Sequence, residues 1–307
     1  MTEILAFGEP LVEFNQTEPG GKLYLQGFGG DTSSFCIAAA RQGARTGYIS
    51  AVGDDRFGQS LRDLWRSEGV DDGHVHTNAT AHTGLYFVSH GEEGHRFDYW
   101  RAGSAASRYT ASMLPREAIM TAKVLHLSGI SLAISESACD AGLEAMAVAR
   151  AHGVRVSFDT NLRLRLWPLA RARAVMREAI RQTDICLPSW DDITQIAGSV
   201  DQDCIVDLLL EWGVQIIALK LGAAGCYVVT AAEPERRTLV DRHTVKAIDA
   251  TGAGDCFGGA FVARLAAGDD PVAAARYANV AAALSTTGYG AVAPIPREAE
   301  VRAALAG

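Results

Sequence analysis

The sequence predicts an α/β protein with three layers, in which helices cover both faces of a mainly parallel β-sheet. The main observation is that short β-branched runs alternate with longer helical patterns after residue 124. The first 53 residues show the same alternation: an apolar run near the N-terminus, then a helical segment, then a second apolar run. Composition agrees with a folded core, because 48% of the 307 residues are hydrophobic and 21% are charged.

The expected strands are short and bounded by turn-forming residues. They lie at residues 4–8, 46–53, 124–130, 154–159, 184–189 and 215–222. Helices are expected between them, including residues 32–43 and 136–153, where Gly153 provides a C-terminal stop. This order of strands and helices is typical of crossover units around a parallel sheet.

The segment from 252 to 284 is rich in Ala and Gly and has few charges. Such a composition predicts buried helices that pack closely. Gly258 and Gly259 would each cost a solvent-exposed helix about 1 kcal/mol. We therefore expect a neighbouring element or a ligand to approach this helix at the two glycines.

Two segments, residues 10–28 and 80–101, interrupt the alternation of strands and helices. In the second, apolar and polar residues alternate around the turn signal Gly91-Glu92-Glu93-Gly94, which predicts a β-hairpin. We expect the two segments to form one small β-sheet that projects from a core made of residues 1–9, 29–79 and 102–307. Such a sheet is either a lid over a cleft or an ordinary surface hairpin.

The charge balance excludes some classes of partner. With 36 acidic and 28 basic side chains the net charge is −8, which disfavours nucleic acid and anionic membranes. Glu3 stands where a signal peptide would carry basic residues, and Asp207 and Glu211 interrupt the longest apolar stretches. The cysteines lack metal-binding spacing, so we expect reduced thiols in a cytoplasmic protein. They are Cys36, Cys139, Cys186, Cys204, Cys226 and Cys256.

The strongest local signal is the string DATGAGD at residues 249–255, which is followed at once by the apolar helical pattern CFGGAFVARLAA. Glycines at a helix entrance leave backbone N–H groups uncovered, and together with the helix dipole these groups favour an anion such as phosphate. Asp255, in the first turn, is a candidate base for a hydroxyl that attacks phosphorus. On these residues alone, the alternative is an Asp that only complements the helix dipole.

The string DATGAGDCFGGAF resembles the C-terminal signature of the ribokinase-like (PfkB) carbohydrate kinases. Gly29-Gly30-Asp31 and the later AVGDDRFGQSLRDLWRSEGV resemble their N-terminal signature. The similarity extends to GEPLV, HLSGISLAIS, FDTNLRLRLW and LKLGAAG, and so covers nearly the whole chain. Within the family, GEPLV, TGLY, YWR and the DTNLR string are similar to 2-keto-3-deoxygluconate kinases. The resemblance implies a ribokinase-like fold in which the small sheet is a lid.

The resemblance also implies the catalytic residues and cofactors. Asp255 would be the base, and the amides of Gly252, Ala253 and Gly254 would stabilise the transferring phosphoryl group of ATP. Magnesium would be carried mainly by the nucleotide phosphates. Asp192 would order a magnesium-bound water.

Further ligand contacts follow from the same resemblance. A monovalent cation such as K⁺ is implied at Asp249 and Thr251. The residues implied for the nucleotide are Lys220, Gly222, Gly225, Gly252, Gly254 and Asn279. For Lys220 the alternative is a strand-end lysine in solvent.

Two arginines indicate what the acceptor is. Arg101 lies on an expected lid strand and Arg163 just beyond a core strand, so the pair could hold a carboxylate from both domains. Neutral sugars need no such pair, although Arg163 also lies in an Arg-rich stretch where a solvated role is common. The acceptor contacts that the resemblance implies are Gly30, Ser34, Tyr86, Tyr99, Arg101, Arg163 and Asp255.

The sequence departs from the family pattern at three places. Ser34 replaces the usual Asn of the N-terminal signature, and Ser189 with Asp192 replaces an Asn-x-x-Glu motif. Cys256 follows the expected base, where a small or hydroxyl residue is more usual. A helix N-terminus lowers a thiol pKa, whereas burial would leave Cys256 inert.

These observations favour an ATP-dependent kinase for the terminal hydroxyl of 2-keto-3-deoxygluconate or a related sugar acid. The alternatives are a kinase for a neutral sugar such as fructose or ribose, and a non-catalytic sugar-acid sensor. Because a small lid sheet exposes apolar side chains, we also expect a homodimer or larger homo-oligomer formed through the lid.

Overall fold

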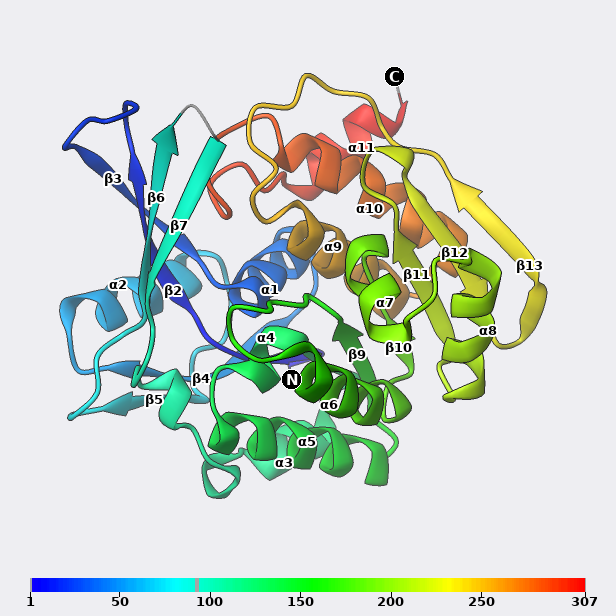
Figure 1. The fold of residues 1–307 in the computed structure, drawn as a ribbon, viewed down its shortest axis with the longest axis horizontal. Helices are drawn as coiled ribbons and strands as arrows, with labels where there is room; N and C mark the ends of the chain where they lie inside the picture. Colours follow the sequence, from blue (N-terminus) through cyan, green and yellow to red (C-terminus); the bar gives the residue numbers. More distant parts are fainter. Residues whose placement is uncertain (1, 92–93, 307) are drawn as a thin grey trace.

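The computed structural model describes residues 2–91 and 94–306. A nine-stranded sheet forms the centre, in the order β13-β12-β11-β10-β9-β8-β1-β4-β5 (Figure 1). Neighbours pair in parallel, except that β12 runs antiparallel to β11 and β13. The strands are β1 (Ile4–Phe7), β4 (Thr46–Gly53), β5 (Val75–Asn78), β8 (Val124–Ser128), β9 (Arg155–Asp159), β10 (Ile185–Cys186), β11 (Ile216–Lys220), β12 (Cys226–Thr230) and β13 (Glu233–Val240).

Helices cover both faces of this sheet, and each face has its own hydrophobic cluster. One face carries α1 (Asp31–Arg41), α2 (Arg56–Ser67), α9 (Ala253–Ala267), α10 (Pro271–Ser285) and α11 (Glu298–Ala306). The other carries α3 (Arg116–Thr121), α4 (Gly129–Ala133), α5 (Glu136–Ala151), α6 (Leu169–Arg181), α7 (Trp190–Ala197) and α8 (Gln202–Glu211). The three-layer α/β/α core expected from the sequence is therefore confirmed.

The expected core strands all form, and their carboxyl ends meet along one edge of the sheet (Figure 1). Phe7, Ser128, Asp159 and Lys220 are the last residues of β1, β8, β9 and β11. Open α/β sheets bind ligands in the crevice outside the carboxyl ends of their strands, at the point where the strand order reverses.

The buried helix α9 packs closely on α1, as its glycines predict. A Cβ on Gly259 would collide with the Phe35 carbonyl oxygen and lie 2.7 Å from the Ala38 Cβ. At Gly258 a Cβ would meet only the side chains of Phe35 and Leu187, at 3.2 and 3.3 Å. Gly259 thus allows two helix backbones to touch, and this contact places their N-termini beside each other.

A second sheet projects from the core in the order β3-β2-β6-β7 (Figure 1). Its strands are β2 (Leu11–Gln16), β3 (Tyr24–Gly29), β6 (Leu85–Gly91) and β7 (Gly94–Trp100). β6 and β7 form the expected antiparallel hairpin, whose turn residues Glu92 and Glu93 lie outside the described residues. The division of the chain into a lid and a core at residues 10–28 and 80–101 remains a prediction.

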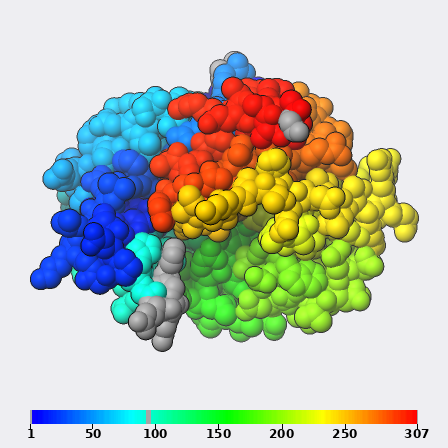
Figure 2. Space-filling model, turned by 90° about the horizontal axis from the view of Figure 1, so that it is seen from above, coloured from blue at the N-terminus to red at the C-terminus, as the bar shows by residue number. Residues whose placement is uncertain are grey.

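The lid sheet lies beside the C-terminal third of the chain, as the blue, cyan and orange-red segments show (Figure 2). On one face its Phe14 ring lies 5.8 Å from the ring of Phe57 in α2. The opposite face buries Leu11, Tyr86 and Val88 in a small cluster of their own. No helix among residues 2–91 and 94–306 is long and apolar enough to cross a membrane.

Candidate active site

A cavity of about 1460 Å³ opens between the lid sheet and the carboxyl edge of the central sheet. It exceeds the roughly 300–1,000 Å³ of a pocket for one drug-sized ligand, so it has room for two substrates. The core lines this cavity with residues of α9, of α1 and of the ends of β9 and β11. The lid lines it with residues of β6 and β7. The predicted site residues in its wall are Gly30, Tyr86, Tyr99, Arg101, Arg163, Asp192, Lys220, Gly222, Thr251, Gly252, Gly254 and Asp255.

The N-terminus of α9 forms part of the cavity wall. Gly252 is the N-cap with a φ of 75°, and a Cβ there would lie 2.9 Å from the Ala291 carbonyl oxygen. Only glycine fits this left-handed, crowded position without strain. The first turn of this 15-residue helix thus borders the cavity through Gly252 and Gly254, whereas the Ala253 amide donates to the Ala250 carbonyl at 3.2 Å. A helix N-terminus of this kind can bind phosphate.

Asp255 lies in the first turn of α9 and borders the same cavity. Burial raises its pKa well above 3.8, and the nearby charges of Asp31 and Asp159 raise it further. Lys220 and Arg163 act in the opposite direction. No other described residue donates a hydrogen bond to this carboxylate, so it is free to accept a proton from a ligand.

Lys220, the last residue of β11, forms an ion pair with the buried carboxylate of Asp159 at the end of β9. Its ammonium lies 3.5 Å from the position of a Cβ on Gly254. The pair therefore fixes a positive charge beside the α9 amides. This position is inconsistent with the alternative of a solvent-exposed strand-end lysine.

Besides Asp249, which is described with the cation residues below, four predicted residues lie outside the cavity wall. Ser34 is buried in α1 and its Oγ has no partner among the described residues. Gly225, with a φ of 98°, packs against the Val240 carbonyl, and Ala253 is not in the wall. The amide of Asn279 donates to the carbonyls of Val240 and Asp241 at 3.0 and 2.9 Å, and so joins α10 to the end of β13. The ligand contacts of these four residues remain predictions.

The predicted cation residues are engaged with protein donors. Asp192 Oδ2 accepts hydrogen bonds from the Leu162 amide at 3.1 Å and from Thr160 Oγ1 at 3.3 Å. Asp249 Oδ1 accepts from the amide and hydroxyl of Thr251, and its Oδ2 accepts from the Gly290 amide. Among the described residues no cluster of three metal-ligating side chains occurs. This donor set would suit a magnesium ion that is carried mainly by nucleotide phosphates, and the role of Asp192 remains a prediction.

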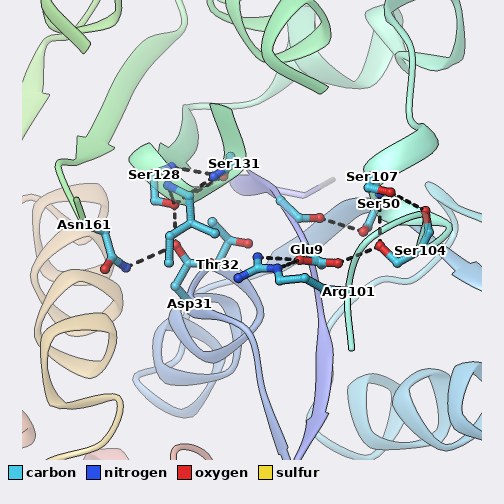
Figure 3. A network of polar contacts seen from close by, with 12 residues as sticks. Glu9, Asp31, Thr32, Ser50, Arg101, Ser104, Ser107, Ser128, Ser131 and Asn161 are labelled. Carbon is cyan, nitrogen blue, oxygen red and sulfur yellow. Dashed lines mark hydrogen bonds and ion pairs between the residues drawn. The ribbon is translucent and has the colours of Figure 1, made fainter. Parts of the chain in front are cut away.

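Arg101 has a partner that the sequence did not reveal. Its Nε donates to Glu9 Oε2 at 2.7 Å and its Nη2 is paired with the same oxygen. Glu9 Oε1 accepts from Ser104 Oγ at 2.7 Å, and the Glu9 side chain is fully buried. Figure 3 shows this group between the lid and the core. The pair ties the end of β7 to the end of β1 and leaves Nη1 of Arg101 for a ligand.

The remaining acceptor-side residues differ in how firmly they are held. Tyr86 is buried, and its hydroxyl donates to Glu13. Tyr99 stacks on Tyr86 with 5.6 Å between ring centroids and is 42% exposed. Arg163 borders the cavity and donates one hydrogen bond, to the adjacent Leu162 carbonyl at 2.9 Å. Most N–H donors of the Arg163 guanidinium are thus available to a ligand.

Two further residues of the cavity wall, Asp31 and Asn161, were not among the predicted site residues. Asp31 stands in the Gly29-Gly30-Asp31 string and Asn161 in the DTNLR string, so the two motifs could have identified both residues.

Cys256 is fully buried, and burial raises the pKa of its thiol to about 12. Of the two alternatives, a thiol with a lowered pKa or an inert buried thiol, Cys256 is therefore the second.

Comparisons with known proteins agree with this geometry. The model of the pfkB family carbohydrate kinases matches residues 1–298. A 2-dehydro-3-deoxygluconokinase from Thermoproteus tenax is 38% identical over 98% of this chain and 94% of its own length. Fructokinase-1 from Zea mays is 34% identical over 97% of this chain and 96% of its own. An E. coli protein assigned as a ribokinase II, solved with ATP and Mg²⁺, has a TM-score of 0.92 at 27% identity, covering 100% and 99% of the two chains.

The chain belongs to the pfkB family of carbohydrate kinases. It is a carbohydrate kinase, an enzyme that transfers a phosphoryl group to a sugar-type acceptor. The resemblance expected from its motifs is thus confirmed.

Replacing Glu9 tests whether the Arg101 pair joins the lid to the core. Glu9→Ala leaves a buried guanidinium without its carboxylate, so we expect a loss of about 3–5 kcal/mol in the free energy of unfolding. Arg101→Ala and the double variant complete a double-mutant cycle in urea, and we expect a coupling above about 2 kcal/mol. The exposed pair of Arg116 and Glu144 is the control, with a coupling below about 1 kcal/mol. Equal coupling in the two pairs would contradict the assignment.

Proposed function

We propose that the enzyme transfers the γ-phosphoryl group of ATP to the terminal hydroxyl of 2-keto-3-deoxygluconate or a closely related sugar acid. The observation that carries this proposal is that Arg101 and Arg163 border the same cavity as Asp255. The 2-dehydro-3-deoxygluconokinase among its relatives supports the same acceptor class. A bidentate guanidinium suits a carboxylate, and no neutral sugar requires one.

The chain's own residues account for the chemistry as follows. Asp255 takes the proton of the acceptor hydroxyl, and that oxygen forms a bond to the γ-phosphorus while the bond from phosphorus to the β–γ bridging oxygen breaks. The amides of Gly252, Ala253 and Gly254, with the ammonium of Lys220, stabilise the negative charge of the transferring group. Magnesium, bound with ATP, would neutralise phosphate charge, and Asp192 would hold one of its waters.

A neutral ketose or ribose is the second candidate, and one observation favours it. Glu9 already compensates the charge of Arg101 and occupies its Nε and Nη2. Recognition of a carboxylate therefore depends mainly on Arg163, whose guanidinium has no carboxylate partner among the described residues. The fructokinase relative is consistent with such an acceptor.

Removing the base is the direct test of the mechanism. Asp255→Asn keeps the side-chain shape but cannot accept the proton, so we expect kcat to fall by about 10²- to 10⁴-fold. The raised pKa predicts that wild-type kcat/KM falls, as the pH is lowered, through a limb that lies above pH 3.8. An assay coupled to ADP release measures both. Activity of the variant within a few-fold of wild type would exclude the role.

The acceptor class is tested with a panel of sugar acids and neutral sugars. With 2-keto-3-deoxygluconate as acceptor, we expect Arg163→Ala to lower kcat/KM by about 10²-fold, because a charge-assisted contact is lost. Arg171→Ala, in an exposed pair on α6, is the matched control and should behave as wild type. If fructose or ribose is the best acceptor and Arg163→Ala leaves its kcat/KM unchanged, the neutral sugar is correct.

We further propose that the lid mediates self-association. It exposes Leu23, Leu25 and Trp100, which are 74%, 67% and 69% accessible. Leu23 and Leu25 belong to the β3 edge of the lid and Trp100 to the β7 edge. Exposed apolar side chains favour burial by a second copy of the chain. Sedimentation velocity at micromolar concentration should show a dimer or larger species, and Leu25→Asp combined with Trp100→Asp should reduce it. A monomeric wild type would refute this expectation.

A further inference from the structure

Residues 286–296 join α10 to α11 and form an irregular loop beside the active-site cavity. Ala291 of this 286–296 loop lies in the cavity wall, and Ala291, Val292 and Ile295 are buried. Buried backbone outside helices and strands needs other partners for its N–H and C=O groups. The partners of this loop therefore show which parts of the molecule hold it in place.

The first half of the loop lies against the segment that leads into α9. The Thr286 carbonyl accepts a hydrogen bond from the Asp249 amide at 3.1 Å, and the Gly290 amide donates to Asp249 Oδ2 at 2.9 Å. The Ala291 carbonyl oxygen lies 2.9 Å from the position of a Cβ on Gly252, the N-cap of α9. The loop thus supports the N-terminus of α9 from behind.

The second half of the loop is held by Arg41, the last residue of α1. Nη1 of Arg41 donates to the carbonyls of Val292, at 3.1 Å, and of Ile295. Its Nε and Nη2 donate to the two carboxylate oxygens of Glu68 at 2.9 and 2.7 Å, and both side chains are 9% exposed. A guanidinium carries five donors in one plane, so it holds the carboxylate and the carbonyls in fixed relative positions.

Gln42, the next residue, extends this attachment. Its Nε2 donates to the Pro296 carbonyl at 2.8 Å, and its Oε1 accepts from the Tyr277 hydroxyl of α10 at 2.7 Å. Because α1 also touches α9 at Gly259, the same helix holds both the loop and α9. Arg41 does not border the cavity, so its effect on a ligand has to pass through the loop.

We propose that Arg41 is a positioning residue for phosphoryl transfer, because it holds the 286–296 loop and thereby fixes the amides at the N-terminus of α9. The proposal rests on the proposed function in placing the transferring phosphoryl group at these amides, but it applies to any acceptor. Dipoles that are already aimed at the developing charge stabilise the transition state without reorganisation. A displacement of about 1 Å caused far from the chemistry can cost about 10²-fold in rate.

Arg41→Lys tests this role, because it keeps the positive charge but cannot hold the carboxylate and the carbonyls together. We expect kcat per mole of folded enzyme to fall by about 10- to 100-fold, with the acceptor KM within about three-fold of wild type. The folded fraction comes from urea unfolding under assay conditions. The acceptor is the best one of the panel.

Binding provides a second readout that does not depend on turnover. The Kd values of a non-hydrolysable ATP analogue and of ADP are measured with magnesium by isothermal titration calorimetry. The terminal phosphate is the part that reaches α9, so we expect the ratio of the two Kd values to shift by about ten-fold in favour of ADP. This ratio is independent of the folded fraction.

Arg62 of α2 provides the matched control. It pairs with Asp72 at 2.8 Å and donates to the Val75 carbonyl, and its side chain is 15% exposed. The same kind of contact thus occurs away from the cavity wall. Arg62→Lys should lower the free energy of unfolding, as Arg41→Lys does, but should keep the wild-type kcat per mole of folded enzyme and the wild-type Kd ratio.

If Arg41→Lys matches Arg62→Lys in both readouts, Arg41 has a structural role only and the proposal is wrong. Glu68→Gln replaces Arg41→Lys if that variant does not fold, because it keeps an oxygen for Arg41 but removes the charge. It should show the same changes to a smaller extent, and wild-type values would reject the proposal. Activity retained by Asp255→Asn would instead reject the proposed role of the α9 N-terminus, so the two failures are distinguishable.

Discussion

The site depends on one packing constraint, which is the contact between the backbones of α1 and α9 at Gly259. Any side chain at this position would separate the helices, since a Cβ would collide with the Phe35 carbonyl. The contact brings the start of α1, with Asp31, and the start of α9, with Asp255, to one cavity. A positive helix terminus and two carboxylates are thereby held in a largely buried environment, where fixed dipoles and charges act more strongly than in water.

The charges in the cavity are arranged in compensated pairs around a few that remain free. Lys220 is compensated by Asp159 and Arg101 by Glu9. Such buried pairs cost desolvation energy, and their value lies in fixing a group in one place. Asp255, without a hydrogen-bond donor among the described residues, and Arg163, without a carboxylate partner among them, are left to act on ligands. The paired charges therefore hold the structure in place, and the unpaired ones are available for catalysis and binding.

The sequence predicted what local patterns encode. The alternation of strands and helices predicted the core strands. The Gly-rich string before α9 predicted the anion site, and Gly258 with Gly259 predicted the close packing of α9. Contacts between distant segments could not be derived in this way. The Glu9–Arg101 pair joins residues 92 positions apart, and the contact of Asp31 with Asn161 spans 130. Only the three-dimensional fold shows that Asn279 binds a strand end and that Ser34 is buried.

The central claim is that acceptor and phosphoryl donor meet at the N-terminus of α9, and a crystal structure of the ternary complex measures this directly. The complex would contain a non-hydrolysable ATP analogue, magnesium and the best acceptor. We expect the terminal phosphate on the amides of residues 252–254 and the reacting hydroxyl within hydrogen-bonding distance of the Asp255 carboxylate. A terminal phosphate bound elsewhere, or an acceptor whose hydroxyl does not reach Asp255, would contradict it.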